Sequence, residues 1–191
     1  MRGRLIPIIL LLGLIASCAG QSSVKPVELL DERTGVTVGA LEDPVELLPD
    51  APGSVLIPGN RPTFAYLGPV EWNRSGTLRY GLWVHIAPGK GEQPGDIRAP
   101  NALTLKLDDG TLALSPIEAP KLGREPYREA VSWGQTAYFD LTPETLRRIA
   151  ASSKLELDIH AVNGSPLSFH PTVDTHAALT RYLQARGITG D

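Results

Sequence analysis

The stretch Leu78-Arg79-Tyr80-Gly81-Leu82-Trp83-Val84-His85-Ile86-Ala87 alternates aliphatic side chains with a second, more polar set. Successive side chains of a β-strand point to opposite faces, so this period of two predicts a strand with one aliphatic face. Residues 64–70 predict a second strand, and Asn73-Arg74-Ser75-Gly76 predicts the turn between the two. We expect this hairpin at the centre of an antiparallel sheet.

Further strand patterns occur on both sides of this hairpin. The expected strands cover residues 36–38, 45–48, 103–107, 111–114, 130–141, 154–162 and 166–170. Asp108-Asp109-Gly110 predicts a tight turn between two of them, and Asn163-Gly164 predicts another. Leu105 is expected to point into the core from the middle of its strand.

Two helices are expected late in the chain. Thr142 as N-cap and Pro143 at the first helical position predict a short helix. An amphipathic helix follows over residues 174–186, and Gly187 ends it. The sequence thus predicts a mainly β protein, a β-sandwich or an open antiparallel sheet, with both helices packed on it. Residues 27–191 are expected to form one globular domain.

The N-terminal segment predicts where the protein is located. Arg2 and Arg4 precede an apolar run over residues 5–15, which is too short to span a membrane and is typical of a secretory signal. It ends in Ile15-Ala16-Ser17-Cys18, which resembles the lipobox of bacterial lipoproteins. The alternative is an ordinary cleaved signal peptide followed by an incidental cysteine.

The lipobox resemblance implies that residues 1–17 are removed and that Cys18 carries lipid. Residues 18–26 are then the lipidated cysteine and a polar tether. Ala19 stands where an aspartate favours the inner membrane in enterobacterial lipoproteins, so the outer membrane is expected. Residues 66–71 and 82–84, with Asn73 and Gly76, are similar to segments of small uncharacterised proteobacterial lipoproteins, which imply no activity.

Charge and composition exclude some partners. The chain carries 18 Lys and Arg against 21 Asp and Glu, without a basic patch, so nucleic acid is not an expected partner. Its single cysteine has no intramolecular disulfide partner. No cofactor is expected.

Several polar residues have the chemistry of a metal or catalytic site. Glu156, Asp158 and His160 share one face of an expected strand, and His170 and His176 follow. Same-face residues of a strand lie nearly 7 Å apart, so a solvated polar face is favoured over a metal site. Residues of triad type are also present, namely Ser132, Asp140 and His160, but no Gly-x-Ser-x-Gly motif accompanies them.

Trp83, His85 and Trp72 are the candidate ligand-binding residues. Alternation turns Trp83 and His85 away from the aliphatic face, where an exposed indole would bind a peptide, a glycan or a protein. The alternative is that the second sheet or the final helix covers this second face.

The expected function is that of a non-catalytic binding or structural module, lipid-anchored through Cys18 at the periplasmic face of the outer membrane. Its ligand is expected to be an envelope protein or a cell-wall polymer. The alternative is an envelope hydrolase with an unrecognised site.

Overall fold

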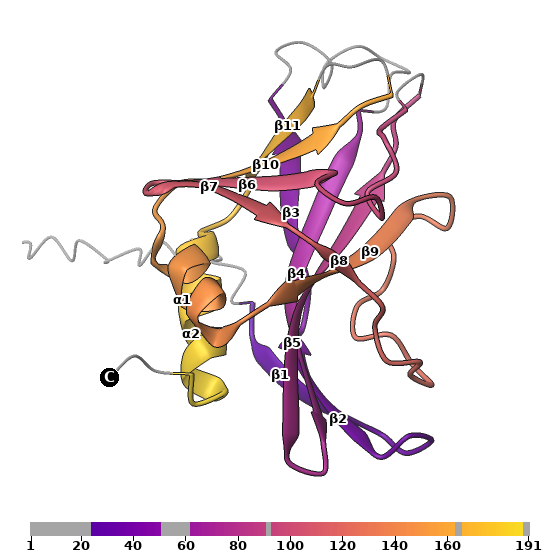
Figure 1. Cartoon of the computed structure of the whole chain (residues 1–191), viewed down its shortest axis with the longest axis vertical. Helices are drawn as coiled ribbons and strands as arrows, with labels where there is room; N and C mark the ends of the chain where they lie inside the picture. Colours follow the sequence, from indigo (N-terminus) through magenta and orange to yellow (C-terminus); the bar gives the residue numbers. More distant parts are fainter. Residues whose placement is uncertain (1–23, 51–61, 91–92, 163–165, 189–191) are drawn as a thin grey trace, which may run out of the picture.

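The computed structural model describes residues 24–50, 62–90, 93–162 and 166–188. It confirms a mainly β, antiparallel protein with two short helices (Figure 1). The lipobox and Asn163-Gly164 lie outside the described residues. The strands are β1 (Pro26–Asp31), β2 (Val36–Leu41), β3 (Val45–Pro49), β4 (Phe64–Arg74), β5 (Thr77–Ala87), β6 (Leu103–Leu107), β7 (Gly110–Leu114), β8 (Pro116–Ile117), β9 (Gln135–Leu141), β10 (Leu155–His160) and β11 (Pro166–Pro171).

These strands form one large sheet that curls on itself. Its main path runs β7-β6-β10-β11-β3-β4-β5-β9-β8, and β1 and β2 branch from it by way of β4. Only Ser115 separates β7, at one end of the path, from β8, at the other. The two ends therefore meet in a single extended run, and the sheet almost closes into a ring.

The predicted central hairpin is present as β4 and β5, which pair along their whole length. Its two-residue turn is Ser75-Gly76, and both residues have positive φ, at 53° and 89°. Such a turn has the twist that an antiparallel hairpin needs. The register places Trp72 opposite Arg79 and Arg74 opposite Thr77.

β4 changes its neighbour halfway along, at Gly68 and Pro69. Its first half pairs with β3 and its second half with β2. The buried Tyr127 lies at this junction, where its hydroxyl donates to the Pro69 carbonyl at 2.8 Å and accepts from the Leu41 N–H at 2.9 Å. Gly68 is required here, because a Cβ on it would lie 2.3 Å from the Tyr127 ring.

The two helices, α1 (Pro143–Ala151) and α2 (Thr175–Ala185), pack side by side (Figure 1). α1 begins as predicted, with Thr142 accepting from the Thr145 N–H at 3.0 Å. α2 ends as predicted, with Gly187 at φ 66°. Arg186 at the end of α2 binds the buried Glu71 of β4 at 2.7 Å, which fixes this helix to the sheet.

Leu105 is fully buried as predicted. Three other expectations from the sequence need correction. The chain is already paired from Pro26, so the expected tether is shorter than residues 18–26. The strand expected over residues 130–141 begins only at Gln135, and Trp133 is 62% exposed in the preceding loop. Both faces of β5 are buried from Gly81 onward. No helix among the described residues is long and apolar enough to cross a membrane.

Candidate binding site

Trp83 and His85 do not form an exposed binding surface. Their side chains are 1% and 0% exposed, so the expectation of an exposed indole at Trp83 is wrong. The irregular segment 118–134 covers this face: Tyr127 packs on Trp83 with ring centroids 5.0 Å apart. A Cβ on Gly134 would lie 2.4 Å from the His85 ring. The covering segment comes from a distant part of the sequence, so strand alternation alone cannot predict it.

His85 is a buried, neutral imidazole at the start of a hydrogen-bonded chain. Its Nδ1 lies 2.8 Å from Thr136 Oγ1, which lies 2.7 Å from a carboxylate oxygen of Glu129. The hydroxyl proton goes to the carboxylate, so Nδ1–H donates to Thr136. Nε2 has no hydrogen-bond partner. Burial lowers the pKa of His85, and Glu129 opposes that shift.

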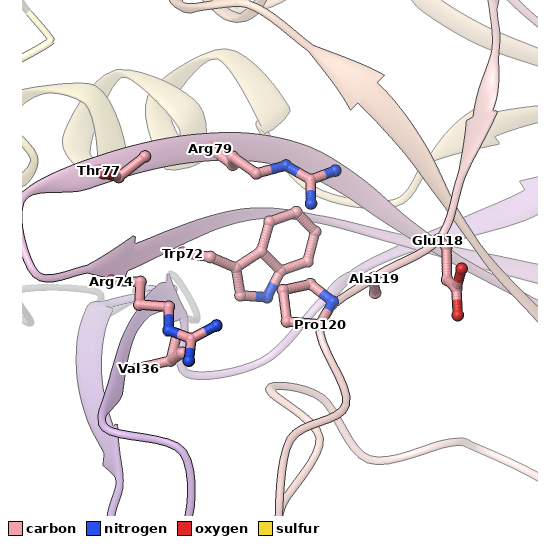
Figure 2. A pocket seen from close by; sticks show the side chains of 8 residues that line it. All are labelled: Val36, Trp72, Arg74, Thr77, Arg79, Glu118, Ala119 and Pro120. Atoms are coloured by element: carbon pink, nitrogen blue, oxygen red, sulfur yellow. The ribbon is translucent and has the colours of Figure 1, made fainter.

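Trp72 lies at a pocket near the turn of the same hairpin (Figure 2). Alternation along β4 and β5, together with their register, places four side chains on one face: Trp72, Arg74, Thr77 and Arg79. Val36 of β2 and residues 118–120, which follow β8, complete the lining. We call this cavity of about 490 Å³ the Trp72 pocket.

The indole of Trp72 is held by packing on both its sides. A Cβ on Gly81 would lie 2.6 Å from its six-membered ring, so only glycine leaves room for it. Tyr138 contacts it with ring centroids 5.4 Å apart. Trp72 is 2% exposed, and its Nε1–H has no hydrogen-bond partner among the described residues. This nitrogen lies on the side of Pro120, and the indole lies between the two guanidinium groups (Figure 2).

Arg74 and Arg79 are exposed and form no ion pair with any described residue. Arg186 on the opposite side of the hairpin, in contrast, binds both Glu28 and Glu71. Arginine is charged at any physiological pH and has five N–H donors. The Trp72 pocket therefore presents two guanidinium groups that are available to a ligand.

The wall formed by residues 118–120 belongs to a segment that is fixed in place. Asp31, at the end of β1 just before the turn to β2, accepts from the Gly123 N–H at 2.8 Å, and this bond lowers the pKa of Asp31. Arg33 of the same turn donates to the Lys121 carbonyl at 3.1 Å. Tyr138 donates to Glu125, and burial together with that carboxylate raises the pKa of Tyr138. These bonds attach residues 121–125 to β1, to the β1–β2 turn and to β9, and so fix the position of the neighbouring wall.

The predicted polar face of residues 156–160 is an ion-pair network. Lys106 of β6 lies 2.6 Å from Glu156 and 2.7 Å from Asp158, and these two bonds raise the pKa of Lys106. His160 is exposed at the end of β10. The described residues contain no group of three His, Cys, Asp or Glu side chains able to hold a metal ion.

The residues of triad type are not joined to one another in the described parts of the chain. Ser132 lies in the loop before β9, Asp140 in β9 and His160 at the end of β10. His176 lines a second cavity, of about 450 Å³, together with Asp174. There, however, Asp174 caps α2 by accepting from the Ala177 N–H at 2.9 Å, and His176 Nδ1 bonds the Ala150 carbonyl. Neither side chain activates a nucleophile in this geometry.

Sequence reasoning named Trp72 but missed Arg74 and Arg79. The two-residue turn Ser75-Gly76 carries enough information to find them, because it sets the register that places both arginines beside Trp72. The third wall could not be found in this way, since residues 118–120 reach the pocket only through the tertiary fold.

Comparison with family models, with curated proteins and with solved structures finds no match to this chain. Its function is therefore argued from the chemistry of the Trp72 pocket and from the N-terminal segment.

Proposed function

We propose that this chain is a lipoprotein of the bacterial outer membrane that faces the periplasm and binds a ligand without catalysing a reaction. The lipobox-like segment Ile15-Ala16-Ser17-Cys18 supports the lipid anchor. With Cys18 lipidated, the tether up to Pro26 has a reach on the order of 15 Å, so the domain stays close to the bilayer. The ligand is an envelope protein or a cell-wall polymer.

The Trp72 pocket is the observation that carries the binding role. Its lining provides two guanidinium groups and one buried indole N–H that have no partner in the described parts of the chain. These groups donate hydrogen bonds and do not exchange protons near neutral pH. Among the described residues that line the pocket, Thr77 has the only hydroxyl and Glu118 the only carboxylate, and there is no histidine, cysteine or serine. Its chemistry suits recognition.

A pull-down of the crosslinked lipoprotein from its own envelope tests this proposal. We expect the wild-type protein to retain a defined partner, and the double variant Arg74→Gln/Arg79→Gln to lose it. Arg98→Gln is the matched control, because Arg98 is an exposed arginine that pairs with Asp96 and does not line the pocket. This control should retain the partner.

The opposite pattern would replace the binding proposal with the hydrolase alternative. In that pattern, the Arg74→Gln/Arg79→Gln variant retains every partner of the wild-type protein. The protein's envelope function is instead lost when His160, His170 and His176 are changed together to Gln. Circular dichroism of both variants establishes that each is folded, so that neither loss can be attributed to unfolding.

A further inference from the structure

The net charge of the Trp72 pocket favours a ligand of opposite charge. Arg74 and Arg79 contribute two positive charges and Glu118 one negative charge, which leaves one net positive charge. A guanidinium fork matches the two oxygens of a carboxylate or of a phosphate. A phosphate near neutral pH carries close to two negative charges, which exceeds the single net positive charge of the lining. A singly charged carboxylate therefore fits better.

The unpartnered Nε1–H of Trp72 supports an acceptor in the same place. A buried donor without an acceptor is destabilising, so such groups are rare in folded proteins. This nitrogen is buried, and Figure 2 shows it on the side of Pro120. A ligand oxygen that displaces Pro120 slightly would satisfy the donor that the free protein leaves unpaired.

The remaining lining and the size suit a small apolar group attached to that carboxylate. Val36, Ala119 and Pro120 contribute apolar contacts, and Thr77 contributes a hydroxyl at the rim. The volume of about 490 Å³ lies within the range of small-molecule sites. The C-terminal residue of a peptide with a small side chain has this combination of charge and apolar surface.

We infer that the Trp72 pocket binds the free carboxylate at the end of a peptide, with the exposed side chains of Arg74 and Arg79 reorienting to its oxygens and Trp72 Nε1–H donating to one of them. This inference rests on the proposed function and names its ligand class. The peptide end comes either from an envelope protein or from the peptide part of a cell-wall polymer.

Calorimetric titration of the purified lipoprotein in detergent tests the inference. The probe is N-acetyl-alanyl-alanine, and its C-terminal amide is the matched control ligand. We expect the free acid to bind and the amide to bind at least about tenfold more weakly, because the amide removes the charge-assisted hydrogen bonds. Arg74→Gln and Arg79→Gln should each weaken the acid at least about tenfold, and Arg98→Gln should not.

Any of four results would overturn the inference. The first two are equal affinity for acid and amide, and absence of binding at millimolar acid. The others are folded arginine variants that bind the acid normally, and displacement of the acid by inorganic phosphate at equal concentration. Binding of the protein domain to phosphatidylglycerol vesicles that Arg79→Gln abolishes would assign the pocket to a lipid headgroup and would also overturn it.

Two further ligands distinguish the possible sources of the peptide end. Comparison with the pull-down distinguishes this inference from the proposed function. Isolated cell-wall fragments that compete with the probe identify the polymer, and peptides from the pull-down partner's C-terminus identify the protein. If an envelope partner binds through Arg74 and Arg79 but the dipeptide acid does not, only the ligand class fails. If changing both arginines leaves the partner bound, the proposed function fails as well.

Discussion

At the scale of single residues, Tyr127 joins three segments that are far apart in the sequence. Its hydroxyl donates to Pro69 in β4 and accepts from Leu41 at the end of β2, and its ring packs on Trp83 in β5. Burial raises the pKa of Tyr127, so the hydroxyl stays protonated and can keep donating. This one side chain satisfies the backbone groups that are left over where β4 changes its neighbour.

Tyr127→Phe should lower the free energy of unfolding by about 1–3 kcal/mol, because it leaves a buried N–H and a buried carbonyl without partners. Urea unfolding measures the change. Tyr66→Phe is the control, since the Tyr66 hydroxyl lies in a partly buried site and makes only a 3.4 Å contact with Glu46. A loss at Tyr127 no larger than that of the control would contradict the role given to this hydroxyl.

His85 should make stability depend on pH. Burial lowers its pKa in the folded protein below the value of about 6.5 expected when unfolded. Between these two pKa values the unfolded chain binds a proton that the folded chain does not. Stability from this group is therefore complete above pH 6.5 and declines as the pH falls below it, by at most about 1.4 kcal/mol per pH unit.

Urea midpoints measured between pH 5 and pH 7.5 check this dependence. Wild-type protein should become less stable toward pH 5, and His85→Gln, although less stable at neutral pH, should show a flatter profile. Parallel profiles for the two proteins would mean that His85 is not the responsible group.

At the scale of elements, the sequence predicts most strands and both helices, because period-two patterns and capping residues are local. The hairpins around Ser75-Gly76 and Asp108-Asp109 both occur as predicted. What the sequence does not predict is which segment of the chain covers each face of the sheet. The second face of β5 is buried by segment 118–134, whose own pattern is irregular. The exposed tryptophan is consequently Trp133, and not Trp83.

Arg186 at the end of α2 forms ion pairs with Glu28 and Glu71, and these pairs attach α2 to the sheet. Arg186 crosses Gly39, where a Cβ would lie 2.7 Å from the guanidinium group, and binds Glu71, whose side chain is 4% exposed. Hydrogen bonding to Glu71 raises the pKa of Arg186. The two charges compensate each other in a site that water barely reaches.

Arg186→Met should cost about 3–5 kcal/mol of stability, because it leaves the Glu71 carboxylate buried without its cation. The double variant Arg186→Met/Glu71→Leu should recover a large part of that loss, since neither charge is then buried. Thermal unfolding of the two proteins measures the difference. Equal stabilities would show that α2 is held by its apolar contacts alone.

At the scale of the whole molecule, the two faces of the β4–β5 hairpin have different partners. Glu71 on one face binds the end of α2, and Trp72 on the other face lines the pocket with segment 118–120. Figure 1 shows the hairpin extending beyond the curled part of the sheet, together with β1 and β2. The contact with α2 and the candidate binding site thus lie on opposite faces of the same hairpin.

The proposed lipid anchor gives a prediction for the whole molecule. Cells grown with labelled palmitate should incorporate the label into the wild-type protein and not into Cys18→Ala, because acylation needs the cysteine. Ser17→Ala is the control, since alanine is another small residue and the label should persist. Label retained in Cys18→Ala, detected after electrophoresis of the purified protein, would contradict the anchor.

The Trp72 indole is also a direct probe of the binding claim, since the chain has only three tryptophans. In ¹⁵N–¹H spectra, the indole signal that Trp72→Phe removes is the signal of Trp72. On titration with N-acetyl-alanyl-alanine, this signal should move downfield as its N–H gains an acceptor, while the signals of Trp83 and Trp133 stay in place. A Trp72 signal that does not move at saturating ligand, or three signals that move together, would contradict the account.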